Sequence, residues 1–343
     1  MDGGSTVAPR GGVAALSHRA VPIGFHASHE QWPPSALLRF VRQAEAAGFT
    51  AAMSSDHFHP WTERDGASGF AWAWLGAALQ ATRLPFGVVS APGQRYHPAI
   101  IAQAVATLDD MFPGRFWLAV GSGEFVNEHI TGEPWPRKDS RNARLREAVD
   151  VMRALWRGDT VDHDGHVRVR AARLHTRPRQ PLPILGAALT EPTAEWMGSW
   201  ADGLITAGAR HDALRRIVEA FRRGGGRGKR LVLQAAVCYG PDEDAALHDA
   251  FTSWRHAALG PTLLADLETP AHFDEATQSV TPDALRDKLR ISSDLARHRG
   301  WIEEDLALGF DEIQLSHVGR GVERFIAAFG DTVLPRLPLA RAS

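Results

Sequence analysis

Cysteine is almost absent from this chain of 343 residues, since Cys238 is its single representative. One cysteine excludes an internal disulfide bond and suits a reducing compartment, so we expect a cytoplasmic protein. The formal net charge of only -2 gives no electrostatic basis for binding nucleic acid or an anionic membrane. Apolar runs are also short, and none reaches the roughly 18 residues that a membrane span needs. These absences point away from nucleic-acid-binding and membrane-spanning proteins.

The length and composition suit one large globular domain. Hydrophobic residues make up 44% of the chain, which is enough for an extensive core. Residues 1–20 are rich in glycine, alanine and arginine and lack the apolar centre of a signal peptide. We therefore expect a disordered N-terminal tail over residues 1–20 and a single domain over residues 21–343.

Short apolar runs that are typical of buried strands alternate along the chain with longer segments that are typical of helices. The expected strands cover residues 22–28, 50–57, 84–92, 115–123, 182–189, 203–208, 231–240 and 311–319. The runs are continuous rather than alternating, as expected for parallel strands that are buried on both faces. Eight such strands separated by helices predict an α/β fold, a closed (β/α)8 TIM barrel. A doubly wound open sheet is the alternative.

Two segments are longer than an ordinary barrel connection. Residues 157–180 have the composition of a small β excursion, and residues 251–285 have that of a helical insertion. Long insertions in a compact domain often have a function. We expect these two to cover the substrate or to form a contact between subunits.

Chemically useful residues gather where the expected strands end, which is where barrel enzymes place their sites. The candidates are Glu30 after the first strand; Asp56, His57 and Trp61 after the second; Val88 and Val89 in the third; Ser122, Gly123, Glu124 and Asn127 after the fourth; Ala187 and Ala188 in the fifth; and Thr206 in the sixth.

These residues favour acid–base chemistry over the other kinds of site. His57 and His59 alternate by two, but Pro60 turns the chain, and no familiar metal-binding spacing is present. A nucleophile elbow is also missing, and Cys238 lies inside an expected strand without an evident base. A histidine in a cleft, by contrast, accepts a proton near neutral pH.

The Gly-Ser-Gly sequence before Glu124 has two interpretations. It exposes backbone N–H groups, so a flat or phosphorylated ligand can approach closely. It is equally compatible with a simple turn of the barrel. Asp56 is similarly open, because it either faces a ligand or only caps the loop after the second strand.

Three longer motifs make the pattern specific. "SDHFHPW", "RYHPAIIAQAVATL" and "FPGRFWLAVGSGEFVNE" together resemble the luciferase-like monooxygenase superfamily. Within it they are similar to the branch of the deazaflavin (coenzyme F420)-dependent glucose-6-phosphate dehydrogenases, and the run that starts with "HASHEQW" also resembles a related clade that uses FMN. The resemblance extends from about residue 22 to about residue 208. It implies the luciferase-like barrel, F420 or FMN as cofactor, and a homodimer.

The resemblance also implies roles for the four candidate catalytic residues. His57 matches the histidine that acts as general base on the substrate hydroxyl as hydride leaves the carbon. Glu124 matches the glutamate that donates a proton to the cofactor. Trp61 matches a tryptophan that lines the substrate pocket and steadies developing charge, and Glu30 matches a further acidic residue in that pocket.

The remaining matches concern the cofactor. Asp56, Ser122, Gly123 and Asn127 match family contacts to it, and Glu124, Ala187, Ala188 and Thr206 are expected beside it. Val88–Val89 falls where the family holds a cis peptide bond under the ring, which costs about 3–4 kcal/mol.

The chain departs from the family pattern in two places. Leu189 replaces a glycine near the phosphate arm of the cofactor, and the sequence after the sixth strand lacks the lysine that binds a sugar phosphate. Arg210 lies near that place, but arginine differs from lysine in geometry. The expected function is hydride transfer between a sugar-like or alcohol carbon and F420 or FMN. A monooxygenase that uses reduced FMN and oxygen, and a flavin-binding barrel without catalysis, are the alternatives.

Overall fold

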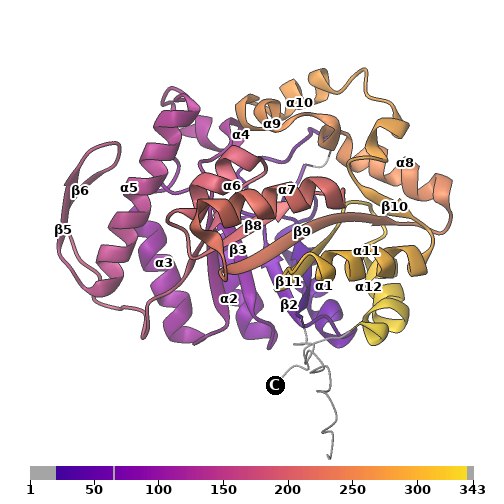
Figure 1. Ribbon diagram of the computed structural model, residues 1–343, viewed down its shortest axis with the longest axis horizontal. Coiled ribbons are helices and arrows are strands. Elements are labelled where there is room, and N and C mark those ends of the chain that lie inside the picture. The colour runs from indigo at the N-terminus through magenta and orange to yellow at the C-terminus, as the bar shows by residue number, and fades with distance from the viewer. Residues whose placement is uncertain (1–20, 65, 338–343) are drawn as a thin grey trace, which may run out of the picture.

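A closed parallel barrel forms the centre of the computed structural model, which describes residues 21–64 and 66–337 (Figure 1). Its strands are β1 (Ile23–Ala27), β2 (Ala51–Ser54), β3 (Phe86–Ser90), β4 (Phe116–Val120), β7 (Ile184–Ala187), β8 (Gly203–Ala207), β9 (Arg230–Tyr239) and β11 (Glu312–His317). They pair in the order β9-β11-β1-β2-β3-β4-β7-β8, and a pairing between β8 and β9 closes the ring. The predicted (β/α)8 barrel is therefore confirmed. The expected N-terminal tail lies outside the described residues.

Strand β9 is longer than the others and has two partners on one edge. Its first half, residues 230–234, pairs with β8, and its last residues pair with β10 (Arg290–Ser292). The sequence did not predict β10, because three residues that begin with a charged arginine carry too little apolar pattern. The Arg290 guanidinium is buried and binds both carboxylate oxygens of Asp305, at 2.5 and 2.7 Å. Because its charge is paired with Asp305, Arg290 can be the first residue of a buried strand.

Helices cover the outside of the barrel. They are α1 (Pro34–Ala46), α2 (Ala71–Ala81), α3 (Pro98–Met111), α5 (Lys138–Arg157), α6 (Glu191–Gly198), α7 (His211–Phe221), α8 (Glu243–Trp254), α11 (Leu295–Ala307) and α12 (Val322–Ala328). Proline starts α1 and α3, where its missing N–H is not needed, and Gly158 with φ of 94° ends α5. None of the described helices is both long enough and apolar enough to cross a membrane.

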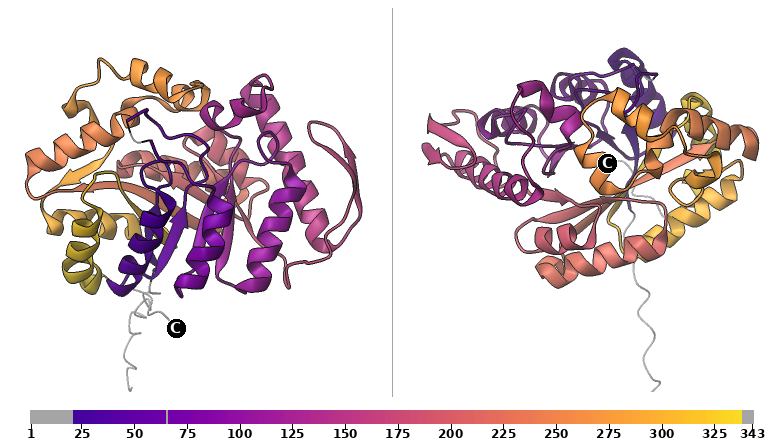
Figure 2. Two further views of the ribbon diagram at one scale, coloured as in Figure 1. Left: turned by 180° about the vertical axis from the view of Figure 1, so that it is seen from behind. Right: turned by 90° about the horizontal axis from the view of Figure 1, so that it is seen from above.

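Two segments extend beyond the barrel. Residues 157–180 contain an antiparallel hairpin of β5 (Val161–Asp164) and β6 (Arg168–Ala172), which projects to one side (Figures 1 and 2). The segment 251–285 contains α9 (Pro261–Asp266), α10 (Pro270–Ala276) and two short 3-10 turns. It lies over the carboxyl ends of the strands, where α9 packs against α4 (Phe125–Glu128) (Figure 1).

Side chains that point into the barrel form a core of their own. It consists of Met53, Trp117, Ala119, Leu185, Ile205 and Val232, with Val89 and Ala187 packed against it. The ring of Trp117 fills the space above Gly87, because a Cβ atom at that glycine would lie only 2.0 Å from the ring. The base of the barrel is therefore filled with side chains, as in other barrels of this kind.

The expected cis peptide bond between Val88 and Val89 is wrong, since the described residues contain no cis peptide bond. Both residues belong to the regular part of β3, where Val88 is opposite Leu118 and Val89 is opposite Ala119. The ladder to β4 continues through both residues in the ordinary trans geometry, which avoids the energetic cost of a cis bond.

Candidate active site

A histidine and a glutamate face each other at the carboxyl end of the barrel. His57 lies in the loop after β2 and Glu124 in the loop after β4, and Nε2 of the ring is 3.6 Å from a carboxylate oxygen. The side chain of His57 is 15% exposed and that of Glu124 is 32% exposed. Both groups are thus sheltered but accessible to a small molecule.

Asn127, in the short helix α4, joins the two side chains. Its Nδ2 lies 3.3 Å from Nδ1 of His57 and 3.4 Å from Oε2 of Glu124. Its Oδ1 accepts hydrogen bonds from the backbone N–H groups of Phe58 and His59. The predicted set His57, Glu124 and Asn127 is therefore one connected group, and the side-chain amide of Asn127 already has a protein partner at each end.

Environment shifts the acidity of the two carboxyl groups in opposite directions. Burial raises the pKa of Glu124 above its ordinary value, while a charged His57 would lower it. Burial alone would also raise the pKa of Glu30, but His57 and His26 lower it to about 2. Ser55 strengthens this effect, since its hydroxyl donates to Glu30. Glu30 is therefore an ionised group at neutral pH, and Glu124 is the carboxyl group that holds a proton more readily.

Trp61 forms a wall beside His57 together with residues from the 251–285 insertion. Its ring is 4.9 Å from the His57 ring, stacks on His256 at 4.8 Å and meets Phe273 edge-on at 5.3 Å. Burial lowers the pKa of His256 to about 3, so this ring is neutral at ordinary pH. The sequence analysis did not predict a role for His256. The only signal was that this histidine follows Trp254 closely in "SWRHAA".

The carboxylate of Asp56 is occupied by protein groups. It accepts hydrogen bonds from Ser90 at 2.7 Å and from Tyr96 at 2.9 Å, and Arg95 lies 3.4 Å away. The Asp56 side chain is only 1% exposed. The structure thus places Asp56 in a buried network that links the loops after β2 and β3.

The Gly-Ser-Gly loop after β4 has the geometry of a tight turn with a nearby cation. Gly123 adopts φ of 85°, a conformation that favours glycine. The hydroxyl of Ser122 accepts a hydrogen bond of 2.7 Å from Nζ of Lys138, at the start of α5. Lys138 is a second residue that sequence reasoning missed, although it follows the fourth strand within the same stretch of chain.

The other predicted cofactor residues divide into two groups. Val89 and Ala187 point into the barrel and are partly exposed. Val88 and Ala188 are buried in the layer between the barrel and the helices. Thr206 is also buried, and its Oγ1 lacks a hydrogen-bond partner among the described residues. Val89 and Ala187 are therefore the members of this set that face the barrel interior and are partly exposed.

Small, partly exposed residues line the upper part of the barrel interior. The small residues at this level are only partly buried: Gly121, Ala187, Ala207 and Ala236. Each follows, by two or four positions along the same chain segment, a buried residue that points into the barrel. Because small side chains in the barrel interior are open to solvent, the barrel is filled below this level and open above it. An apolar floor with polar groups at its edge suits a flat cofactor.

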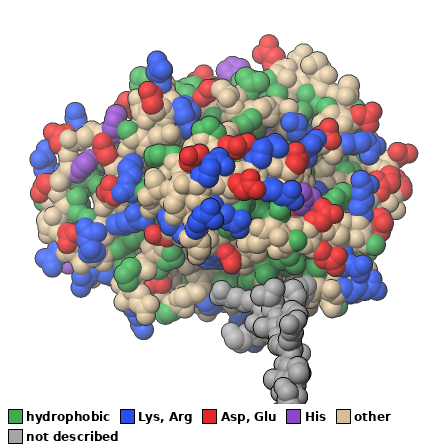
Figure 3. Space-filling model, viewed as in Figure 1, with side chains coloured by type: hydrophobic (Ala, Val, Ile, Leu, Met, Phe, Trp, Pro, Cys, Tyr) green, Lys and Arg blue, Asp and Glu red, His purple; other side chains and the backbone are tan. Residues whose placement is uncertain are grey.

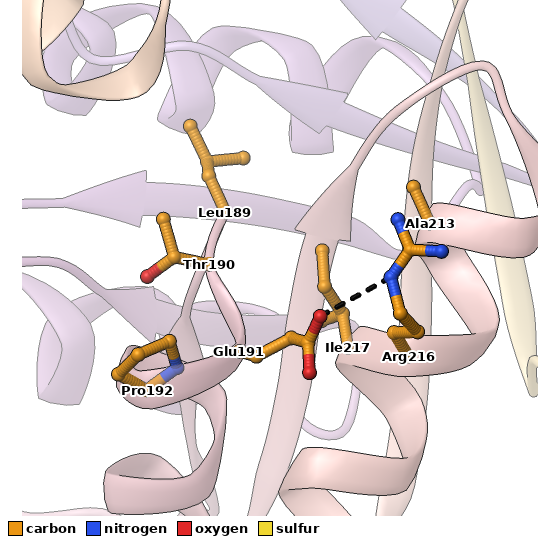
Figure 4. A pocket seen from close by; sticks show the side chains of 7 residues that line it. All are labelled: Leu189, Thr190, Glu191, Pro192, Ala213, Arg216 and Ile217. Atoms are coloured by element: carbon orange, nitrogen blue, oxygen red, sulfur yellow. Dashed lines mark hydrogen bonds and ion pairs between the residues drawn. The ribbon is translucent and has the colours of Figure 1, made fainter.

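A second hollow lies outside the barrel mouth. An open groove of about 450 Å³ runs between the starts of α6 and α7 and is lined by Leu189, Thr190, Glu191, Pro192, Ala213, Arg216 and Ile217 (Figure 4). The one cation among these lining residues, Arg216, is paired with Glu191 and Asp212, both at 3.2 Å. Arg210 is exposed and paired with Asp212 at 3.1 Å. Figure 3 shows the same mixture of charges over this face. The groove is therefore close to electrically neutral.

Other kinds of chemistry find little support in the described residues. No group of three or more histidine, cysteine, aspartate or glutamate side chains there could hold a metal ion. Cys238 is buried, and burial raises the pKa of its thiol. The group that stands out is the His57–Glu124 pair beside an open apolar floor.

Comparison with known proteins decides the family. Residues 16–313 match the sequence profile of the family described as luciferase-like monooxygenase. The chain belongs to the luciferase-like monooxygenase family. Among its curated relatives, the F420-dependent glucose-6-phosphate dehydrogenase of Nakamurella multipartita is 34% identical over 328 residues, which cover 92% of this chain and 96% of the relative. The enzyme of the same name from Mycobacterium tuberculosis is 32% identical, with coverage of 92% and 97%.

Two solved structures are similar to this chain. An F420-dependent secondary alcohol dehydrogenase, solved with an F420-acetone adduct, has a TM-score of 0.84 and 31% identity, and 92% of this chain covers 98% of it. The F420-dependent tetrahydromethanopterin reductase of Methanopyrus kandleri has a TM-score of 0.76 at 20% identity, with coverage of 93% and 99%. The second likeness concerns the fold alone.

Proposed function

We propose that this protein is an F420-dependent oxidoreductase that moves a hydride between the cofactor and a substrate carbon bearing a hydroxyl or carbonyl oxygen. The observation that carries the proposal is the His57–Glu124 pair, 3.6 Å apart beside an open apolar floor. Relatives named as F420-dependent dehydrogenases that align over 92% of the chain support the choice of cofactor. FMN is the alternative cofactor.

The residues at the barrel mouth fit such a cofactor. Val89, Ala187 and Ala207 would support its flat ring system, and the Gly-Ser-Gly loop offers backbone N–H groups at the edge. Lys138, which donates to Ser122, supplies a positive charge for an acidic cofactor arm. The deazaflavin, when bound, supplies a carrier that accepts or releases two electrons as a hydride.

The protein's own contribution is to position the substrate and to handle its hydroxyl proton. We assign proton transfer to Glu124, since it is accessible and its raised pKa lets it hold a proton, and we assign contact with the substrate oxygen to His57. Glu30, ionised and bonded to Ser55, contributes a fixed negative charge near His57. Trp61 excludes water from one side and forms the pocket wall with His256.

We propose a sugar-like or simple alcohol as substrate. The wall formed by Trp61, His256 and Phe273 is aromatic, and His256 is neutral. The cations of the outer groove are already paired with carboxylates. These features favour a substrate without phosphate over glucose 6-phosphate.

A titration of the full chain with F420 and, separately, with FMN tests the cofactor. We expect F420 to bind and to be reduced when a secondary alcohol or a free sugar is added. Binding of FMN alone would overturn the choice of F420. Oxygen consumption with reduced FMN and substrate would replace the proposed dehydrogenase by a monooxygenase.

We also propose a homodimer. Helix α2 contains no charged residue, and its exposed positions include Ala73, Ala77 and Ala81. Ile100 and Met111 of the neighbouring α3 are more than half exposed. An apolar outer face of this kind is typical of subunit contacts. Light scattering coupled to gel filtration should give twice the monomer mass, and a monomer would contradict this part of the proposal.

A further inference from the structure

The orientation of the Asn127 side chain is fixed by its surroundings. Its Oδ1 lies 2.8 Å from the backbone nitrogen of Phe58 and 3.3 Å from that of His59. Backbone N–H groups only donate, so the atom that they share must be the oxygen of the amide. The Asn127 amide nitrogen is therefore the atom that faces His57 and Glu124.

This orientation determines which nitrogen of His57 carries the proton. The amide nitrogen of Asn127 only donates, and it lies 3.3 Å from Nδ1 of His57. An Nδ1–H group at this place would set two donors against each other. A neutral imidazole has one N–H, so with Nδ1 as acceptor the proton is on Nε2, the atom that faces Glu124.

We propose that Asn127 is a positioning residue that holds His57 as its neutral Nε2–H tautomer, so that His57 presents a hydrogen-bond donor to the substrate oxygen. This inference deepens the proposed function and rests on it for the identity of the substrate. The lone pair of the ring is at Nδ1, occupied by Asn127. To accept a proton at Nε2, the ring would first have to give up that tautomer and its hydrogen bond to Asn127.

Glu124 completes the arrangement. Its Oε2 receives the second N–H of Asn127 at 3.4 Å and lies 3.6 Å from Nε2 of His57. One amide therefore sets the donor direction of His57 and orients the carboxyl group beside it. The other ionisable groups that face His57 are Glu30, His26, His29 and His256. Among the described residues none of these four forms a hydrogen bond with its Nδ1, so they do not compete with Asn127 for this atom.

The test is nitrogen NMR of the histidine rings in the full-length, cofactor-free protein at neutral pH. Protonated and unprotonated ring nitrogens differ widely in 15N chemical shift, so the spectrum reports the tautomer directly. The chain has 16 histidines, and the His57 signals are identified by their loss in a His57→Gln variant. We expect an unprotonated Nδ1 and a protonated Nε2, and an Nδ1–H signal for His57 would overturn the proposal.

Asn127→Asp is the matched variant. It keeps an oxygen for the N–H groups of Phe58 and His59, but it replaces the donor that faces Nδ1 with an acceptor. We expect the proton to move to Nδ1, and turnover of the holoenzyme to fall by about 10²-fold or more, since a wrong tautomer costs up to ~10⁴-fold in a serine protease. An unchanged tautomer in this variant would contradict the proposal.

The wild-type spectrum alone decides the question if the variant does not fold. Because the spectrum needs neither cofactor nor substrate, it is independent of the choice of F420. A failed F420 titration would overturn the proposed function and leave the tautomer standing. An Nδ1–H tautomer together with F420-dependent turnover would overturn the proposed role of Asn127 and leave the proposed function standing.

Discussion

Nε2 of His57 and the carboxylate of Glu124 lie 3.6 Å apart, although the two residues follow different strands with β3 between them. The barrel brings the carboxyl ends of its strands into one ring, so loops that are distant in sequence meet there. This pair is the centre of the proposed chemistry, and the first two predictions concern its members.

Replacement of His57 by alanine should lower kcat by about 10²–10³-fold, the usual cost of removing one hydrogen-bond donor to a reacting oxygen. Binding of F420 should change little, because the residues proposed to support its ring system, Val89, Ala187 and Ala207, are unchanged in this variant. Stopped-flow reduction of the cofactor measures the first quantity, and a fluorescence titration measures the second. His175→Ala, on the exposed surface near the β5–β6 hairpin, is the control and should behave as the wild type. Full turnover of the His57 variant would contradict the role proposed for this residue.

Glu124→Gln should raise stability at neutral pH while lowering turnover. Burial raises the pKa of Glu124 above the ordinary value of 4.5, so the folded state binds the proton more tightly than the unfolded chain. The contribution of Glu124 to the free energy of unfolding is therefore largest below pH 4.5, and it is lost as the pH rises through the raised pKa of the folded state. Glutamine has no charge to desolvate, so its advantage should appear above pH 4.5 and vanish below. Urea unfolding at several pH values measures the difference, and a pH-independent difference would contradict the explanation.

Gly87→Ala should destabilise the protein by about 1–3 kcal/mol or more, because its methyl group would collide with the packed ring of Trp117. Gly76→Ala, inside α2, is the matched control, since a Cβ there meets nothing within 4 Å. Alanine favours a helix more than glycine does, so this variant should gain about 0.5–1 kcal/mol. Chemical denaturation of the two variants checks both signs, and equal effects would show that the barrel base is less tightly filled than described.

Arg290→Met should cost about 3–5 kcal/mol, because it leaves the carboxylate of Asp305 buried without its main partner. The double variant Arg290→Met, Asp305→Leu should recover a large part of this loss, since it removes both charges. A double-mutant cycle measured by urea denaturation gives the coupling between the two sites. Additive losses would mean that the ion pair does not account for the stability of β10.

The sequence predicted those features that depend on local pattern. Strand lengths, apolar continuity and the clustering of polar residues at strand ends were sufficient to locate the barrel and to bring His57, Glu124 and Trp61 to one end. The family resemblance added the expected roles. These predictions succeed because a barrel fixes where each strand end lies, whatever the side chains beyond it do.

Features that depend on contacts between distant segments could not be predicted in the same way. His256 reaches Trp61 only because the insertion folds back over the barrel, and no pattern in the sequence gives that path. The buried network that joins Asp56 to Ser90, Tyr96 and Arg95 links two loops, and no pattern in the sequence gives these pairings. The expected cis bond at Val88–Val89 came from resemblance and not from residues that enforce it.

The wall around Trp61 is shared between the barrel and the insertion 251–285, whereas His57, Glu124 and Asn127 all come from the segments that directly follow β2 and β4 of the barrel. Under the proposed function, selectivity and reactivity reside in separable modules. A lineage can exchange the insertion and admit a different molecule while the reaction stays the same. Relatives with one redox centre and unlike substrates are the expected outcome of that separation.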